Sequence, residues 1–137
     1  MTISNNIIGI VDDEIDITDL FRDALCRISG VLVFTFNDSL KALEHFTVNM
    51  ERYLLVLSDF RMPGLNGLEL LRKVKTLNPY VRTILMSAFE VEGDPIFHKY
   101  LKDDVINTFF QKPITISHLY NEVNSQIHTY QLSHNRK

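Results

Sequence analysis

The sequence of 137 residues contains one cysteine, Cys26, so no disulfide can form within the chain. Cys26 falls in an apolar helical stripe, which predicts a small residue of the core. No apolar run approaches the length that spans a membrane. The first six residues also lack the basic and apolar regions of a signal peptide. These absences predict a cytoplasmic protein that contacts no membrane.

Neither sign of charge is in large excess. Lys and Arg number 14 against 17 Asp and Glu, a formal net charge of -3, which argues against a surface for nucleic acid. Hydrophobic residues make up 45% and charged residues 23%, as in ordinary soluble proteins. The length suits one domain. We therefore expect a single domain over residues 1–137, with a core from about 5 to 131 and a short polar tail at 132–137.

Apolar or β-branched runs alternate with stretches of helical periodicity along the whole chain. The expected strands cover residues 7–11, 31–36, 53–57, 81–86 and 105–110. The expected helices carry apolar stripes over residues 17–28, 40–50, 68–77, 96–101 and 116–130. Gly30 is expected to close the first helix. This alternation predicts an α/β fold, a five-stranded parallel sheet with helices on both faces.

Polar side chains follow several of these strands at the point where each strand ends. Asp12 and Asp13 follow the first, Asp59 the third, Ser87 the fourth and Lys112 the fifth. Because the carboxyl ends of parallel strands meet at one edge of a sheet, we expect these side chains to share a crevice. Carboxylates held close together repel one another unless a cation neutralises them, and oxygen ligands suit Mg²⁺. The residues therefore predict a metal-assisted phosphoryl site with Asp59 as a possible nucleophile.

Structural roles for the same residues stay open at this point. Asp12 and Asp13 could cap the helix that follows, where the macrodipole favours acidic groups. Asp59 could be a polar residue that ends its strand.

Taken together, the residues resemble the receiver domain of two-component response regulators, in its stand-alone, chemotaxis-type form. The resemblance covers essentially the whole chain. It rests on Asp12-Asp13-Glu14, on Asp59 with Met62-Pro63-Gly64 and Asn66-Gly67, on Ser87-Ala88, and on Lys112-Pro113. It implies a flavodoxin-like sheet in the order 2-1-3-4-5 with five helices. It also implies that Asp59 accepts a phosphoryl group from a sensor histidine kinase or a phosphotransfer protein.

The resemblance implies further roles at the phosphoryl site. Mg²⁺ (or Mn²⁺) would be held by Asp13, Asp59 and the backbone carbonyl of Arg61, with Asp12 acting through water. Lys112 would pair with the phosphoryl oxygens. Pro113 would follow a cis peptide bond.

A conformational readout is implied as well. Ser87 matches the hydroxyl residue that moves toward the phosphoryl group, and Phe109 the aromatic residue that turns inward with it. Phe109 could equally be a plain core residue. The signal would leave through the face made by the fourth helix, fifth strand and fifth helix, toward a downstream protein that the sequence does not name. Arg61 and Phe89 stand where receivers tune the lifetime of the phosphoryl group, although both could point to solvent.

Three features depart from the usual receiver pattern. The switch aromatic, Phe109, has no phenolic hydroxyl that could report its position through a hydrogen bond. Receivers usually carry a small Gly-Ala pair before the fifth strand, and this chain has Asp103-Asp104-Val105-Ile106 there. The span from Ser87 to Lys112 is also a few residues longer than usual.

Other classes of protein fit less well. Mg²⁺-dependent phosphatases that resemble the haloacid dehalogenases carry a second Asp two residues after the nucleophile, and no Asp follows Asp59 at that spacing. A flavin-binding protein needs a phosphate loop after the first strand, where this chain is acidic. A receiver-like scaffold that is never phosphorylated would not need the complete set of site residues. We therefore expect a signalling domain that catalyses only its own phosphotransfer and dephosphorylation; a phosphate sink or relay intermediate without a switch stays open.

Overall fold

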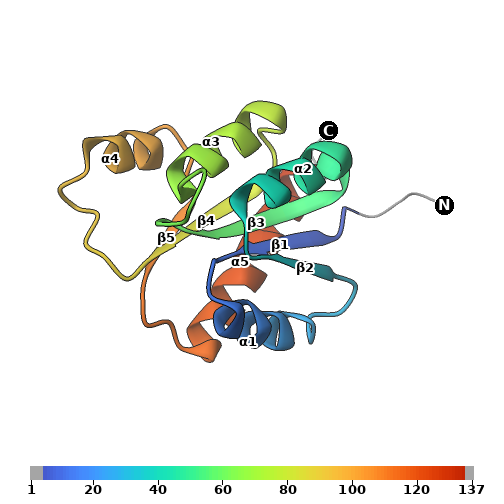
Figure 1. The fold of residues 1–137 in the computed structure, drawn as a ribbon. Coiled ribbons are helices and arrows are strands. Elements are labelled where there is room, and N and C mark those ends of the chain that lie inside the picture. The colour runs from blue at the N-terminus through green and yellow to red at the C-terminus, as the bar shows by residue number, and fades with distance from the viewer. Residues whose placement is uncertain (1–4, 135–137) are drawn as a thin grey trace.

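The computed structural model describes residues 5–134 and has five parallel strands in the order β2-β1-β3-β4-β5 (Figure 1). This confirms the predicted sheet and its order. The strands are β1 (Ile7–Val11), β2 (Leu32–Phe36), β3 (Tyr53–Asp59), β4 (Arg82–Ser87) and β5 (Thr108–Gln111).

Five α-helices and one short 3₁₀ helix connect the strands. They are α1 (Ile15–Leu25), α2 (Ser39–Asn49), η1 (Met50–Arg52), α3 (Gly67–Leu77), α4 (Pro95–Lys102) and α5 (Ile116–His134). In Figure 1, α1 and α5 cover one face of the sheet, and α2, α3 and α4 cover the other. The fold thus has three layers, with the sheet in the middle.

The central strands β1 and β3 are buried along their whole length. This explains why their sequences are unbroken apolar runs, since both faces of each strand meet helices. Phe21 of α1 and Leu119 of α5 pack on one face of the sheet, and Phe46 of α2 and Leu71 of α3 on the other. A sheet clamped in this way holds the carboxyl ends of its strands in a fixed arrangement.

Three sequence predictions differ from the structure. Cys26 is exposed rather than part of the core, because α1 ends at Leu25 and Cys26 is its C-cap residue. Gly30 has a φ of 83° in the turn before β2 and does not close the helix. At the other end of the chain, α5 runs to His134, into the segment expected to be a polar tail.

β5 is shorter than its apolar run predicted and begins at Thr108. Val105 and Ile106 precede it, and both of their backbone N–H groups donate to the carbonyl of Tyr100 at the end of α4, over 2.8 and 3.1 Å. Their backbone N–H groups are therefore hydrogen-bonded to the end of α4 and not to a neighbouring strand.

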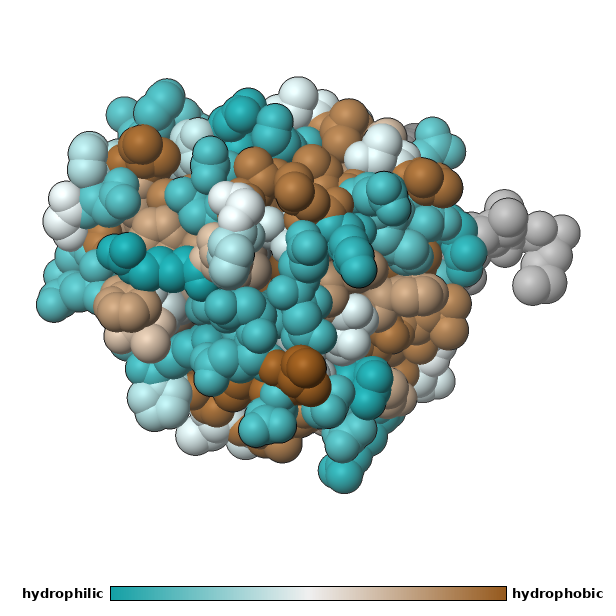
Figure 2. All heavy atoms as spheres, viewed as in Figure 1, coloured by the Kyte–Doolittle hydropathy of each residue, from teal (hydrophilic) through white to brown (hydrophobic). Residues whose placement is uncertain are grey.

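None of the helices in the described part of the chain is both long and apolar enough to cross a bilayer. On the face seen in Figure 2, hydrophobic residues form separate groups between hydrophilic ones.

Asp104, just after α4, has a φ of 60° and is the only non-glycine residue in the left-handed region among those described. Its N–H lies 3.4 Å from the carbonyl of Leu101, so it continues the last turn of α4. This position favours glycine, because a Cβ atom strains the left-handed backbone. The acidic pair that departs from the usual receiver sequence thus stands at a strained turn.

Two substitutions at Asp104 isolate this strain. Both Asp104→Gly and Asp104→Ala remove the carboxylate, but only alanine keeps the strained Cβ. We expect the glycine variant to have the higher free energy of unfolding, by about 1 kcal/mol. Urea denaturation measures the difference.

The same pair of substitutions at Asp103 is the matched control. Asp103 has a φ of -87°, where glycine only adds freedom to the unfolded chain, so the order of the two variants should reverse. An alanine variant at position 104 as stable as the glycine variant would contradict the strain.

Candidate functional site

Three carboxylates meet at the carboxyl edge of the sheet. Asp12 and Asp13 follow β1, and Asp59 is the last residue of β3. Each offers one oxygen atom, and these atoms lie within 4.8 Å of one another. Asp12 is completely buried, Asp59 is 8% exposed and Asp13 is exposed. The structure therefore brings together the acidic residues that the sequence placed at strand ends.

Lys112 joins the two buried carboxylates. Its Nζ lies 2.7 Å from Asp12 Oδ2 and 3.1 Å from Asp59 Oδ1. The residue follows β5, and its backbone N–H donates to the carbonyl of Ser87 over 2.8 Å. The peptide bond between Lys112 and Pro113 is cis, as the resemblance implied. One amine thus ties together the ends of β1, β3 and β5.

The charges in this crevice do not balance. Burial raises the pKa of Asp59, and the neighbouring Asp12 charge raises it further, while Lys112 opposes both effects. Burial by itself lowers the pKa of Lys112, but its hydrogen bonds and charge attraction to Asp12 and Asp59 outweigh this and raise it. Three carboxylates thus face one ammonium group, which leaves room for a further cation.

The donor set fits a hard divalent ion. Mg²⁺ prefers carboxylate, carbonyl and water oxygens, and the crevice offers three carboxylates in reach of one point. When all three carboxylates are ionised, Lys112 neutralises one of their negative charges and two remain. The acidic crevice could therefore bind Mg²⁺ or Mn²⁺ through Asp12, Asp13 and Asp59.

Asn37, the residue after β2, is hydrogen-bonded to the loop that carries Asp12 and Asp13. Its Nδ2 donates to the backbone carbonyl of Asp12 over 2.8 Å and to the hydroxyl of buried Thr18 over 3.1 Å. The backbone N–H of Glu14 in turn donates to Asp12 Oδ1 over 3.0 Å. Sequence reasoning assigned Asn37 no role, although its place at a strand end was a usable signal. Asn37 therefore fixes the backbone from which two of the three carboxylates project.

The loop after Asp59 is positioned by two further residues, Gly67, which belongs to the motif that carries the resemblance, and Ser39. Gly67 begins α3, and a Cβ atom there would lie 2.2 Å from the carbonyl oxygen of Asp59. Only glycine lets the helix start so close to the end of β3. Across the loop, buried Ser39 donates to the carbonyl of Pro63 over 3.2 Å and accepts from the N–H of Leu65 over 3.0 Å.

Ser87 lies at the same edge, but its hydroxyl is engaged elsewhere. The Oγ atom accepts from the backbone N–H of Phe89 over 2.9 Å and donates to the carbonyl of Phe89 over 3.0 Å. No hydrogen bond joins this hydroxyl to Asp59 or Lys112 within residues 5–134. For this hydroxyl to bond a group in the acidic crevice, both of its hydrogen bonds to Phe89 would have to break.

Phe109 of β5 is half-buried and packs against α4. Its ring centroid lies 5.1 Å from that of Phe97, at an interplanar angle of 70°. The ring therefore already contacts the helix that follows the Ser87 loop.

Arg61 and Phe89, expected to flank the phosphoryl position, contact each other. The guanidinium carbon of Arg61 lies 4.7 Å from the ring centroid of Phe89 and 5.5 Å from that of Phe60. Phe89 is 55% exposed, so this cation–π pair lies at the surface. Neither side chain is extended alone into solvent.

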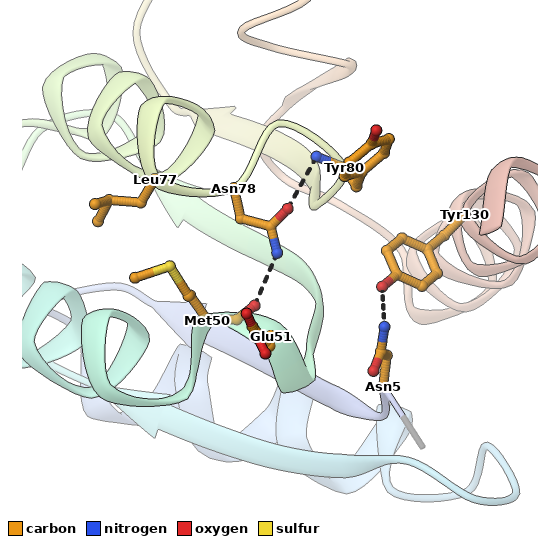
Figure 3. A pocket seen from close by; sticks show the side chains of 7 residues that line it. All are labelled: Asn5, Met50, Glu51, Leu77, Asn78, Tyr80 and Tyr130. Atoms are coloured by element: carbon orange, nitrogen blue, oxygen red, sulfur yellow. Dashed lines mark hydrogen bonds between the residues drawn. The ribbon is translucent and has the colours of Figure 1, made fainter. Parts of the chain in front are cut away.

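A separate hollow of about 450 Å³ lies at the opposite edge of the sheet (Figure 3). There Asn78 accepts from the N–H of Tyr80 over 3.2 Å and donates to the carbonyl of Met50 over 2.9 Å. Tyr130 of α5 and Asn5 are hydrogen-bonded on its other side. These bonds tie the end of α3 to η1, which is a structural role, and the hollow shares no residue with the acidic crevice.

Comparison with known proteins gives a consistent assignment. Residues 8–124 match the response regulator receiver domain family. Sporulation initiation phosphotransferase F of Bacillus subtilis is 32% identical over 115 residues, which are 84% of this chain and 88% of that protein. A solved response regulator receiver domain protein from Clostridium thermocellum is 28% identical, with a TM-score of 0.79 over 93% of this chain and 98% of that one.

Some relatives are much longer than this chain. The match to transcriptional regulatory protein ZraR of Klebsiella oxytoca is 38% identical over 80 residues, which are only 17% of that protein. The family match, however, covers most of the present sequence and includes every strand end described above. The chain belongs to the response regulator receiver domain family.

Proposed function

We propose that Asp59 accepts a phosphoryl group from a phosphohistidine and that the phosphorylated domain signals by contact with another protein. The observation that carries this proposal is the position of Lys112, whose Nζ lies within 3.1 Å of both Asp12 and Asp59. An acidic crevice that holds an ammonium group beside a nearly buried carboxylate suits the transfer of a phosphoryl group.

The transfer uses the Asp59 oxygen that Lys112 leaves free. Lys112 bonds Oδ1, so Oδ2 attacks phosphorus, the bond from phosphorus to the histidine nitrogen breaks, and its electron pair stays on the imidazole. Lys112 then pairs with the charge of the phosphoryl oxygens. When Mg²⁺ is bound, it neutralises part of that charge. Asp13, Asp59 and the carbonyl of Arg61 would hold it, and Asp12 would act through water.

A sensor histidine kinase or a phosphotransfer protein is the donor we propose. The similarity to a protein named as a phosphotransferase supports a place in a phosphorelay. The alternative of a Mg²⁺-dependent phosphatase has less support, because no second Asp stands two residues after Asp59, where Arg61 is found.

The readout starts at Ser87. A phosphoryl group on Asp59 offers its hydroxyl a charged acceptor, which is a stronger partner than the backbone carbonyl of Phe89. Rotation toward it would release both hydrogen bonds to Phe89 and free the loop that leads into α4. Phe109 and its partner Phe97 would then carry the change to the face made by α4, β5 and α5.

The lifetime of the phosphoryl group depends on the approach of water to it. In this proposal the stacked pair of Arg61 and Phe89 flanks this approach, and neither side chain offers an acceptor for a proton of the attacking water. We therefore expect a long-lived phosphorylated state.

Phosphorylation of Asp59 is tested with a small phosphodonor. With acetyl phosphate and Mg²⁺, we expect the mass of one phosphoryl group to appear on a peptide that contains Asp59. The Asp59→Asn variant should gain none, and chelation of Mg²⁺ should suppress the gain in the wild type. An equal gain in both proteins would refute the assignment.

The switch is tested with beryllofluoride, which mimics a bound phosphoryl group. We expect amide chemical-shift changes to concentrate on residues 87–121, because Ser87, Phe109 and α4 move together. Asp59→Asn is the control that should not respond. Changes confined to the neighbours of Asp59 would show a phosphate sink or relay intermediate without a switch.

If Arg61 and Phe89 shield the phosphoryl group, a double substitution of these residues should change the rate at which phosphate is lost. Arg61→Asn/Phe89→Glu supplies small and acidic groups that can position water, so the loss of phosphate should be faster. A tenfold change corresponds to about 1.4 kcal/mol in the activation barrier. Release of phosphate from phosphorylated protein measures the rate. Arg72→Asn, on the exposed face of α3, is the matched control; a double variant that decays no faster than this control would exclude the shielding.

A further inference from the structure

A hollow of about 630 Å³ opens at the amino-terminal edge of the sheet, away from the acidic crevice. The end of α3, the first residue of β4 and the segment between α4 and β5 form its walls. Its lining consists of Lys75, Pro79, Arg82, Asp103, Asp104, Val105 and Asn107. Two cationic side chains therefore share one hollow.

The amine of Lys75 has only neutral partners. Its Nζ donates to the side-chain oxygen of Asn107 over 2.9 Å and makes a longer contact of 3.5 Å with the carbonyl of Pro79. Within residues 5–134, no carboxylate oxygen lies within 4.0 Å of this nitrogen. The two acceptors occupy two positions of the tetrahedral nitrogen, and the third is free for a molecule in the hollow.

Burial, together with the charge of Arg82, disfavours the ammonium form of this amine. Asp103 is held by Lys99 over 2.8 Å on the exposed side of α4. Asp104 attracts both Lys75 and Arg82, and Glu122 of α5 attracts Arg82. Burial and the repulsion from Arg82 outweigh Asp104 and lower the pKa of Lys75 to about 8. At pH 7.5 roughly a quarter of such amines are neutral, against about one in a thousand for an ordinary lysine.

We propose that Lys75 is a site of acylation by acyl phosphates. The neutral amine attacks the carbonyl carbon, a bond between carbon and nitrogen forms, and the bond from that carbon to the phosphate oxygen breaks. Inorganic phosphate leaves with the electron pair, and the proton of the nitrogen passes to phosphate or water. The product is an amide of Lys75.

Arg82 makes an acyl phosphate the fitting donor class. Arg82 lines the same hollow, and within residues 5–134 its guanidinium uses only Nε in a protein hydrogen bond, to Gln126 over 2.7 Å. The terminal nitrogens can therefore meet the phosphate of the donor, as a guanidinium does well. An acyl donor without an anionic group would not benefit from Arg82.

Acylation would change how α3 is attached to the sheet. The same oxygen of Asn107 that accepts from Lys75 also accepts from the N–H and the hydroxyl of Thr83 on β4. Loss of the ammonium charge weakens the bond between α3 and this junction. This inference concerns a second site and does not depend on phosphorylation of Asp59.

The test exposes the whole protein to acetyl phosphate and follows each lysine by mass spectrometry. Lys73, a half-buried lysine on the same helix, is the internal reference. We expect Lys75 to be acetylated at least tenfold faster than Lys73 at pH 7.5. Its rate should level off above a pH of about 8, and Asp59→Asn should leave it unchanged. Equal rates at the two lysines, or a Lys75 rate that still rises at high pH, would overturn the proposal.

A second variant tests the donor class. Arg82→Gln changes the basicity of Lys75 equally toward every donor, so the ratio of rates with acetyl phosphate and with an uncharged acetyl ester isolates phosphate recognition. We expect this ratio to fall at least threefold in Arg82→Gln. An unchanged ratio would show that the hollow does not select acyl phosphates.

Discussion

The amine of Lys112 is the contact on which the functional edge of this domain depends. It joins Asp12 and Asp59, two carboxylates that repel each other in a nearly dry crevice, and so connects the ends of β1, β3 and β5. Removal of the Lys112 charge would leave both buried carboxylates without a cationic partner, which is costly in such surroundings. The rest of the edge is arranged around this triad, with Asn37 and Gly67 fixing the backbone on either side.

The triad also explains why this edge should respond to phosphorylation. One ammonium group does not neutralise three carboxylates, so the excess negative charge of the crevice favours binding of a cation. A phosphoryl group on Asp59 would give Lys112 a new partner. Around it, the polar bonds are local and exchangeable. Among the described residues, the hydroxyl of Ser87 bonds only the backbone of Phe89, and Arg61 lies on the ring of the same residue. In the proposed readout, these contacts link a change at Asp59 to the loop before α4.

The charged residues are arranged differently at the amino-terminal edge of the sheet. There Lys75 and Arg82 lie half-buried with neutral hydrogen-bond partners, and Asp104 attracts both from a strained turn nearby. The acidic edge stabilises the ammonium form of its lysine, whereas this edge lowers the pKa of Lys75. The same side-chain type is thus held as a charge at one end of the strands and, in our proposal, serves as a reactive amine at the other.

The residue pattern by itself determined the parallel sheet and the acidic residues at the strand ends, whereas the strand order came from the resemblance to receiver domains. Unbroken apolar runs report burial on both faces, and a parallel sheet must gather its strand ends at one edge. The sequence did not place Cys26 or the start of β5, because the ends of elements depend on which backbone groups find partners. Only the tertiary structure paired Arg61 with Phe89, set Asn37 under Asp12 and placed Lys75 beside Arg82. These contacts join segments far apart in the chain or depend on side-chain direction, and neither spacing nor periodicity encodes them.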